Sequence, residues 1–313
     1  MAHLVETMMY ANAVPWHGLG EKVEGEALYD WRKCVKAAGL DWTVESEPLY
    51  LADGRPVSHV ANIRQTDKAV LGVVGPAFTI LQNDSVFEWF EPFLQTGEAS
   101  IEAAGSLAGG SRIWALAKIK GAEADVVKGD PVERYVLLSH SHDGSLAVRV
   151  GFTDVRVVCN NTLTMAHRDK AGSQLIRLKH TKNVEANLQL IRETMDLARQ
   201  GFYANLEQFK RLARTEINQK DVERYMQMVL GAVGEEKIPT KTQNRIDHLV
   251  ELAYQGIGND GSTLWDAYNA VTQHTTWERG RTAETRLNAA WYGDGAQMNA
   301  KALALALEFE PAA

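Results

Sequence analysis

The sequence predicts an α+β fold, with an antiparallel β-sheet core in the N-terminal and middle parts followed by a helical C-terminal third. Short β-prone runs separated by turn residues fill residues 41–180, whereas apolar residues recur at helical spacing from residue 184 onward. Strands first and helices later favour α+β over alternating β-α-β units. We therefore expect a β-rich core over residues 1–182 and a helical region over residues 183–313, which could pack together as one domain.

The composition is that of an ordinary globular protein. Of the 313 residues, 45% are hydrophobic and 23% are charged, which predicts a real core. No apolar run approaches the roughly 18 to 20 residues that a membrane span needs, and no secretory signal is recognisable. The only cysteines, Cys34 and Cys159, exclude a disulfide framework. We expect a cytoplasmic protein without a membrane partner.

Residues 1–100 are expected to hold a loop, two helices and several short strands. The segment before residue 27 is rich in helix breakers, and Asn83 is a good N-cap for an amphipathic helix. The expected helices lie over residues 27–38 and 83–94, and the expected strands over residues 42–44, 56–63 and 69–74.

The middle third has the clearest β pattern. Asp143-Gly144 predicts a two-residue hairpin turn, because both residues tolerate positive φ. The register of that turn would place one set of residues on the core face: Tyr135, Leu137, Ser139, Leu146, Val148, Val150 and Phe152. A short helix is expected over residues 161–167. The expected strands lie over residues 100–107, 111–120, 134–140, 145–152 and 174–180.

The C-terminal part is expected to be helical. Apolar residues spaced alternately by four and three from Val184 to Phe202 predict one long helix with a heptad seam. Such a stripe packs more often on its own domain than on a partner. Further helices are expected over residues 242–255, 262–274, 283–291 and 297–309.

Positive charge is concentrated in one stretch of an acidic chain. The net charge of −7 argues mildly against a polyanionic partner. Residues 1–100 carry 7 Lys/Arg against 14 Asp/Glu, but residues 141–182 carry 7 against 3, a local net charge of +4. This distribution is typical of a local anion-binding surface.

One alternating strand carries the most informative functional pattern. Arg112, Trp114 and Lys118 share a face of the strand over 111–120. If that face is exposed, it suits single-stranded nucleic acid, because phosphates meet the cations while a base stacks on the indole. The competing interpretation places Trp114 in the core, with the charged side chains extending past it to solvent.

Other basic residues fall on neighbouring β segments, and a common sheet would gather them into one groove. The expected nucleic-acid-binding residues are Arg112, Trp114, Lys118, Arg149, Arg156, Arg177 and Lys179. We expect no catalytic residue, no metal site and no cofactor. His140 and His142 would share a strand face, but no third ligand has a diagnostic spacing. The role of this pair stays open, as does that of the Trp16-His17-Gly18 loop, which is either a binding loop or an N-terminal arm.

Several strings resemble the phage/plasmid-like protein family, a domain of unknown function of phages, plasmids and bacterial genomes. The strings include Trp16-His17-Gly18-Leu19-Gly20, His142-Asp143-Gly144-Ser145, Asn160-Asn161-Thr162-Leu163 and Trp265-Asp266-Ala267-Tyr268-Asn269. The resemblance implies a mobile-element setting and a cytosolic protein, and it carries no activity. A curved sheet followed by a helix, beside a basic stretch, is also similar in fold to phage single-strand annealing proteins, which form rings or filaments.

These observations favour a homo-oligomeric, non-enzymatic protein that binds and anneals single-stranded DNA in recombination or replication; RNA remains open as the ligand. The alternative is a protein-binding scaffold, or a protein that modulates host or defence functions, without nucleic-acid binding. The acidic net charge and the heptad seam favour that alternative. A third hypothesis is an enzyme with a site around His140, His142 and Asp143.

Overall fold

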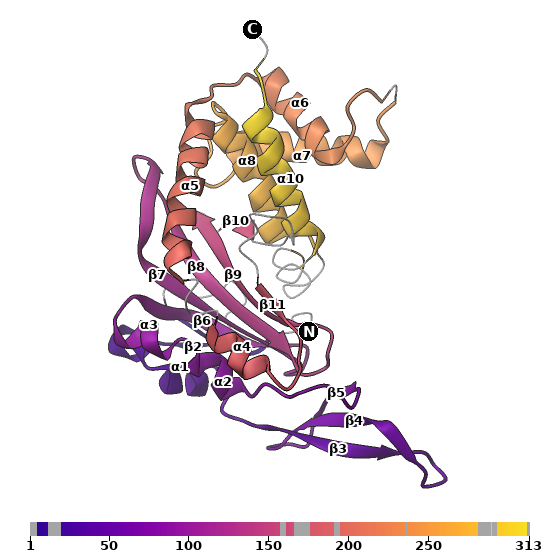
Figure 1. Cartoon of the computed structure of the whole chain (residues 1–313). Coiled ribbons are helices and arrows are strands. Elements are labelled where there is room, and N and C mark those ends of the chain that lie inside the picture. The colour runs from indigo at the N-terminus through magenta and orange to yellow at the C-terminus, as the bar shows by residue number, and fades with distance from the viewer. Residues whose placement is uncertain are drawn as a thin grey trace. The chain divides into compact units, whose positions relative to one another are not determined.

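A computed structural model describes residues 5–11, 20–156, 161–165, 176–190, 195–235, 237–280, 289 and 293–311. The fold is α+β as predicted, with antiparallel sheets in the N-terminal and middle parts and helices in the C-terminal part (Figure 1). The chain forms two compact units, each built from more than one stretch of sequence. The first unit holds Met1–Lys120, Tyr135–Phe152 and Gln174–Asp196, and the second holds Gly121–Arg134, Thr153–Ser173 and Leu197–Ala313.

The main sheet has the strand order β10-β9-β8-β7-β6-β1-β2, and β11 pairs with β9 beside this path. Its strands are β1 (Val5–Tyr10), β2 (Glu21–Lys22), β6 (Ala99–Leu107), β7 (Arg112–Val127), β8 (Asp130–Ser141), β9 (Val148–Arg156), β10 (Asn161–Met165) and β11 (Ile176–Leu178). Most of the expected middle strands are therefore present. β7 extends to Val127, beyond the strand over 111–120 that the alternation of side chains predicted.

Two strands of this sheet contradict the sequence predictions. β1 lies where a loop was expected and pairs antiparallel with β6, and Gly105 permits the close approach of the two backbones. A Cβ at Gly105 would lie 2.5 Å from the carbonyl oxygen of Thr7. The helix expected over 161–167 is wrong, because β10 pairs antiparallel with β9. In both cases the strand depends on the pairing partner more than on local propensity.

The connection between β8 and β9 is a loop over residues 142–147, not a two-residue turn. Gly144 has a φ of +73°, and the Asp143 carboxylate accepts a hydrogen bond from the Ser145 amide at 2.8 Å. The residues predicted to share the core face are buried, apart from the half-buried Tyr135, but the opposite face of β8 is buried as well. Leu138, on the face predicted to lie outside, is as buried as Leu137 on the predicted core face.

A second, three-stranded antiparallel sheet lies in the first unit, with the order β3-β4-β5. Its strands are β3 (Val44–Tyr50), β4 (Pro56–Arg64) and β5 (Val70–Val74). One face packs on the loop over 142–147, where Asn62 donates a hydrogen bond to the carbonyl of His142 at 2.7 Å. A Cβ at Gly72 would lie 2.5 Å from the Asp143 Cα, so this contact is close.

Among its described residues, the first unit has one 3-10 turn and four short helices: η1 (Gly25–Tyr29), α1 (Trp31–Ala37), α2 (Asn83–Glu88), α3 (Glu91–Gln95) and α4 (Val184–Leu190). Asp30 caps α1, accepting hydrogen bonds from the amides of Arg32 and Lys33. The single helix expected over 83–94 is divided into α2 and α3.

The second unit contributes most of the long helices: α5 (Met195–Arg214), α6 (Gln219–Leu230), α7 (Thr240–Gln255), α8 (Leu264–Gln273), the π-helix η3 (His274–Glu278) and α10 (Asp294–Glu308). The expected helices over 242–255, 262–274 and 297–309 are thus present as α7, α8 and α10. The fourth expected segment, 283–291, lies almost wholly outside the described residues. The predicted seam runs through α4 and α5, which are separated by residues 191–194 outside the description. None of the helices in the described ranges has the length and apolar character needed to cross a bilayer.

The helices of the second unit are anchored by buried polar contacts. Arg134 and Asp154 form a fully buried ion pair with two hydrogen bonds of 2.7 and 2.9 Å. Asn205 of α5 donates to the same carboxylate, and the Trp265 indole of α8 donates to Asp130 at 2.8 Å. Because every one of these groups has a partner, the burial of charge is tolerated.

Candidate functional site

Two of the expected cations face each other across neighbouring strands. In the register of β11 and β9, Arg177 lies directly opposite Arg149. Directly opposed residues leave the sheet on the same side, with Cβ atoms about 5 Å apart. Arg149 is half-buried, Arg177 is exposed, and the exposed Lys179 follows directly after β11. Two positive charges placed in this way favour the binding of an anion beside them.

Arg112 and Lys118 lie on β7, which is separated from β9 by β8. At the usual strand spacing this places the β7 and β9 backbones about 10 Å apart. Both side chains are half-buried. The Arg112 guanidinium donates a hydrogen bond from Nε to the Ser145 hydroxyl at 3.2 Å, which ties it to the loop over 142–147.

Trp114 does not offer a stacking surface. Its side chain is only 4% exposed, so the expectation that its indole faces a nucleic-acid base is wrong, and the competing core interpretation holds. The register explains the burial in part, since Trp114 lies opposite Gly105 on β6, where no side chain competes for the space. Alternation along a strand predicts which residues share a face but not whether another element covers that face.

The remaining expected sites fall partly outside the description. Arg156 is the last residue of β9 and belongs to the second unit, but its side chain lies outside the described part of the chain, as does the Trp16-His17-Gly18 loop. Of the predicted set, the structure therefore brings together Arg149, Arg177 and Lys179, with Arg112 and Lys118 on a nearby strand.

Three buried histidines form a cluster in the first unit. His140 lies near the end of β8, His142 is the first residue of the loop after it, and His180 follows β11. The His140 ring centroid lies 4.8 Å from that of His142 and 5.8 Å from that of His180. Phe78 stacks on His180 at 4.5 Å. Sequence reasoning paired His140 with His142 but missed His180, which only the β11–β9 pairing brings near.

Burial keeps this cluster neutral. It lowers the pKa of His140 well below its ordinary value, and the neighbouring His142 and His180 lower it further. Burial also lowers the pKa of His142 to about 3 and lowers that of His180. Neither ring nitrogen of His140 has a hydrogen-bond partner within the described residues. Groups that protonate so reluctantly are weak bases at neutral pH, which argues against the acid–base enzyme hypothesis at this place.

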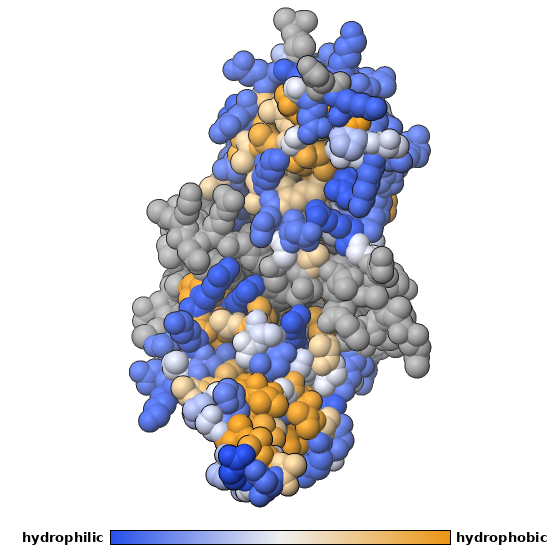
Figure 2. Space-filling model, turned by 90° about the vertical axis from the view of Figure 1, so that its right-hand side faces the viewer, coloured by the Kyte–Doolittle hydropathy of each residue, from blue (hydrophilic) through white to orange (hydrophobic). Residues whose placement is uncertain are grey.

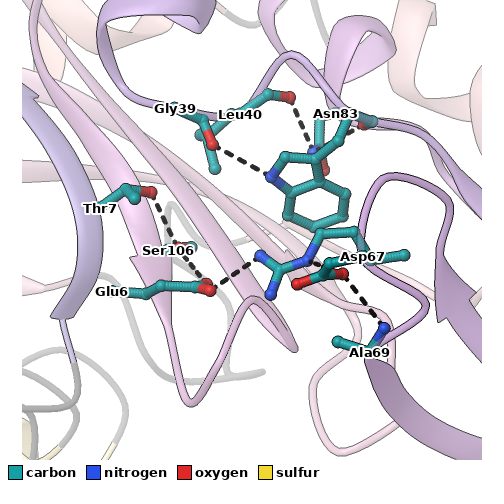
Figure 3. A network of polar contacts seen from close by, with 10 residues as sticks. Glu6, Thr7, Gly39, Leu40, Asp67, Ala69, Asn83 and Ser106 are labelled. Atoms are coloured by element: carbon teal, nitrogen blue, oxygen red, sulfur yellow. Dashed lines mark hydrogen bonds and ion pairs between the residues drawn. The ribbon is translucent and has the colours of Figure 1, made fainter.

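A polar network around Asn83 supports the cluster (Figure 3). Asn83 donates to the carbonyls of Leu40 and Trp42, and its Oδ1 lies 3.1 Å from His142 Nε2. Its predicted role as an N-cap is therefore wrong. Gln82 occupies the N-cap position, and its side-chain amide exchanges two hydrogen bonds of 2.9 Å with the backbone of Val44.

The same network continues to β1 through Arg64. Its guanidinium pairs with Glu6 at 2.8 Å and with Asp67 at 3.0 Å, and it lies 5.1 Å from the Trp42 ring. Ser106 donates to the Glu6 carboxylate at 3.1 Å (Figure 3). These contacts hold β1, the β4–β5 turn and α2 around the histidines.

Comparison with known proteins assigns a family and no activity. The family model described as a domain of unknown function (DUF932) matches residues 70–291, which contain the predicted cations and the three buried histidines. No curated protein and no solved structure matches the chain.

Proposed function

We propose that this chain, which belongs to the DUF932 family (a domain of unknown function), binds single-stranded nucleic acid. In this proposal it catalyses no reaction. In this proposal the protein is a homo-oligomer of a phage or plasmid that holds and anneals single-stranded DNA during recombination or replication. Its binding surface is centred on Arg149, Arg177 and Lys179.

The observation that carries the proposal is the cross-strand pair of Arg149 and Arg177. Two guanidinium groups on directly opposed strand residues suit a phosphate, because the exposed Arg177 can donate two parallel hydrogen bonds to its oxygens while the half-buried Arg149 adds positive charge beside it. The pair lies in the stretch over 141–182, where 7 Lys/Arg stand against 3 Asp/Glu in an otherwise acidic chain.

Because Trp114 is buried, the proposed affinity rests mainly on charge. Each phosphate neutralised on a single strand contributes a slope of about −0.7 to the dependence of log K on log salt. Three cations give a slope of about −2, and the addition of Arg112 and Lys118 about −3.5. Little sequence preference is expected, since phosphate contacts carry no base information.

The test is fluorescence anisotropy with a labelled thymidine oligonucleotide at several salt concentrations. An Arg177→Ala/Lys179→Ala variant removes two exposed cations, so binding at low salt should fall at least tenfold and the slope should shrink by about 1.4. The matched control removes exposed cations elsewhere in the same unit, in Lys33→Ala/Lys36→Ala on α1. No binding by the unaltered protein at about 50 mM salt, or an equal loss in both variants, would refute the proposal.

Annealing needs a separate measurement. Two complementary strands carrying a donor and an acceptor dye should pair faster in the presence of the protein. If the protein binds single strands but leaves the pairing rate unchanged, the binding part of the proposal stands and the annealing part is wrong.

A protein-binding function is the second candidate, and the surface of the three-stranded sheet favours it. Four exposed apolar side chains lie on this sheet or directly after β3: Tyr50, Leu51, Val70 and Val73. A hydrophobic patch is visible at the lower end of the face shown in Figure 2. Exposed apolar patches mark interaction sites in soluble proteins. This candidate predicts a specific protein in a pull-down that Val73→Glu abolishes, with no salt-sensitive binding of oligonucleotides.

A further inference from the structure

Two helices of the second unit bring two imidazoles and one carboxylate together. His248 lies on α7, whereas His274 and Glu278 lie on the π-helix that continues α8. One ligand atom from each of the three residues lies within 4.8 Å of the other two. His248 Nε2 is 2.5 Å and His274 Nδ1 is 3.1 Å from the same oxygen, Oε2 of Glu278.

From this geometry we propose that His248, His274 and Glu278 form a binding site for a divalent first-row transition metal ion, with zinc as its best-fitting occupant. Two histidines and one glutamate make up a known three-ligand set for zinc, which leaves the fourth position to water or a ligand. Imidazole nitrogens select such ions over magnesium and calcium, which prefer oxygen ligands.

The distances require only a small adjustment. Tetrahedral zinc with bonds of about 2.0–2.2 Å holds its ligand atoms about 3.4 Å apart. The two nitrogen–oxygen separations would therefore widen by less than about 1 Å, and the separation of the two ring nitrogens, at most 4.8 Å, would close by up to about 1.4 Å. His248 and Glu278 have side chains that are 42% and 32% exposed, so both can rotate to make this room, while the 13% exposed His274 is held in place.

A further carboxylate stands behind one of the ligands. Glu251, one turn after His248 on α7, places its Oε2 3.8 Å from His248 Nδ1, the ring nitrogen that faces away from Glu278. Histidines that bind a metal commonly direct their second nitrogen at a carboxylate, which orients the ring and makes it a better ligand.

The backbone at the site widens into a π-turn at the C-terminal end of α8. The Arg279 amide donates to the carbonyl of His274 at 2.9 Å, a bond that spans five residues in place of the four of an α-helix. Here the wider turn carries both His274 and Glu278, and the metal would join it to α7.

The test uses the full chain with any affinity tag removed, since a histidine tag would itself bind zinc. After dialysis against a chelator, calorimetric titration with zinc chloride should show one ion bound per chain. Cobalt chloride should give the intense visible absorption of a four-coordinate site. Magnesium chloride should give no heat of binding.

Two variants decide whether these residues are the ligands. Glu278→Gln keeps the size and hydrogen-bonding capacity of the side chain, and His248→Ala removes an exposed ring. Each should weaken zinc binding at least tenfold and abolish the cobalt spectrum, with circular dichroism unchanged. His59→Ala, at an exposed histidine of β4, should bind zinc like the unaltered protein.

The proposal fails if the unaltered chain takes up no zinc in a saturable manner. It also fails if Glu278→Gln and His248→Ala bind zinc with unchanged stoichiometry and affinity, because the ion would then lie elsewhere, for instance at the buried histidines.

Discussion

Acid should destabilise the first unit through its three buried histidines. An unfolded histidine has a pKa of about 6.5, whereas burial lowers the folded-state pKa of His140, His142 and His180. Below pH 6.5 the unfolded chain therefore binds protons that the folded chain does not. Stability contributed by these groups is fully present above pH 6.5 and is lost as the pH falls toward their folded pKa values.

The expected loss is large compared with the stability of a domain. One pKa unit corresponds to about 1.4 kcal/mol. A histidine that stays neutral in the folded protein at pH 5 therefore lowers the free energy of unfolding at that pH by about 2 kcal/mol. His142, with a folded-state pKa of about 3, would alone remove about 2 kcal/mol, out of a typical total of roughly 5–15 kcal/mol, and the lowered pKa values of His140 and His180 add to this loss. Asp143 does not obscure this window, because hydrogen bonds from Ser145 help to lower its pKa below the ordinary carboxyl value.

The variant that isolates the effect is His140→Leu. Both ring nitrogens of His140 lack hydrogen-bond partners within the described residues, so an apolar side chain of similar size should be tolerated. Urea unfolding followed by circular dichroism at pH 7 and pH 5 gives the free energy of unfolding. The variant should lose about 2 kcal/mol less than the unaltered protein between these pH values, whereas His59→Leu, at an exposed histidine, should behave like the unaltered protein. An equal loss in the unaltered protein and in His140→Leu would show that His140 does not titrate in this way.

Two further predictions concern buried side chains. Trp114→Ala should lower the free energy of unfolding by about 3–5 kcal/mol, because it empties a large volume of the core. Trp114→Phe should leave oligonucleotide affinity within twofold in the anisotropy assay. A tenfold loss of affinity in that variant would show that the indole contacts the nucleic acid after all. The Cys34 thiol should resist a thiol reagent such as DTNB at pH 8 until the protein unfolds, since burial raises its pKa to about 12. A Cys159→Ser variant makes that measurement specific to Cys34, and rapid labelling in the native state would contradict the burial.

The sequence located most elements that depend on local patterns. The strands β4, β5, β6 and β8 and the helices α7, α8 and α10 coincide with predicted segments to within a few residues. The helix α6 was missed although its ends carry clear signals: a capping box between Asn218 and Asp221, and Gly231 in the left-handed conformation after its last turn. These signals are local and therefore predict the helix from the amino-acid order alone.

The candidate sites were predicted less completely, because they depend on contacts between distant segments. The pairing of Arg149 with Arg177 follows from the register of β11 on β9, and His180 joins His140 by the same pairing. His248 and His274 meet because α7 packs on α8, and no spacing in the sequence indicates this.

The amino-acid order alone was enough for the α+β class, the positions of most strands and helices, and the basic stretch in mid-chain. Each of these depends on residues within one turn or one strand, where periodicity and charge can be read directly. The burial of Trp114, the strand character of residues 161–165 and the grouping of histidines emerged from the folded chain, because burial and strand pairing depend on which distant segment covers a residue.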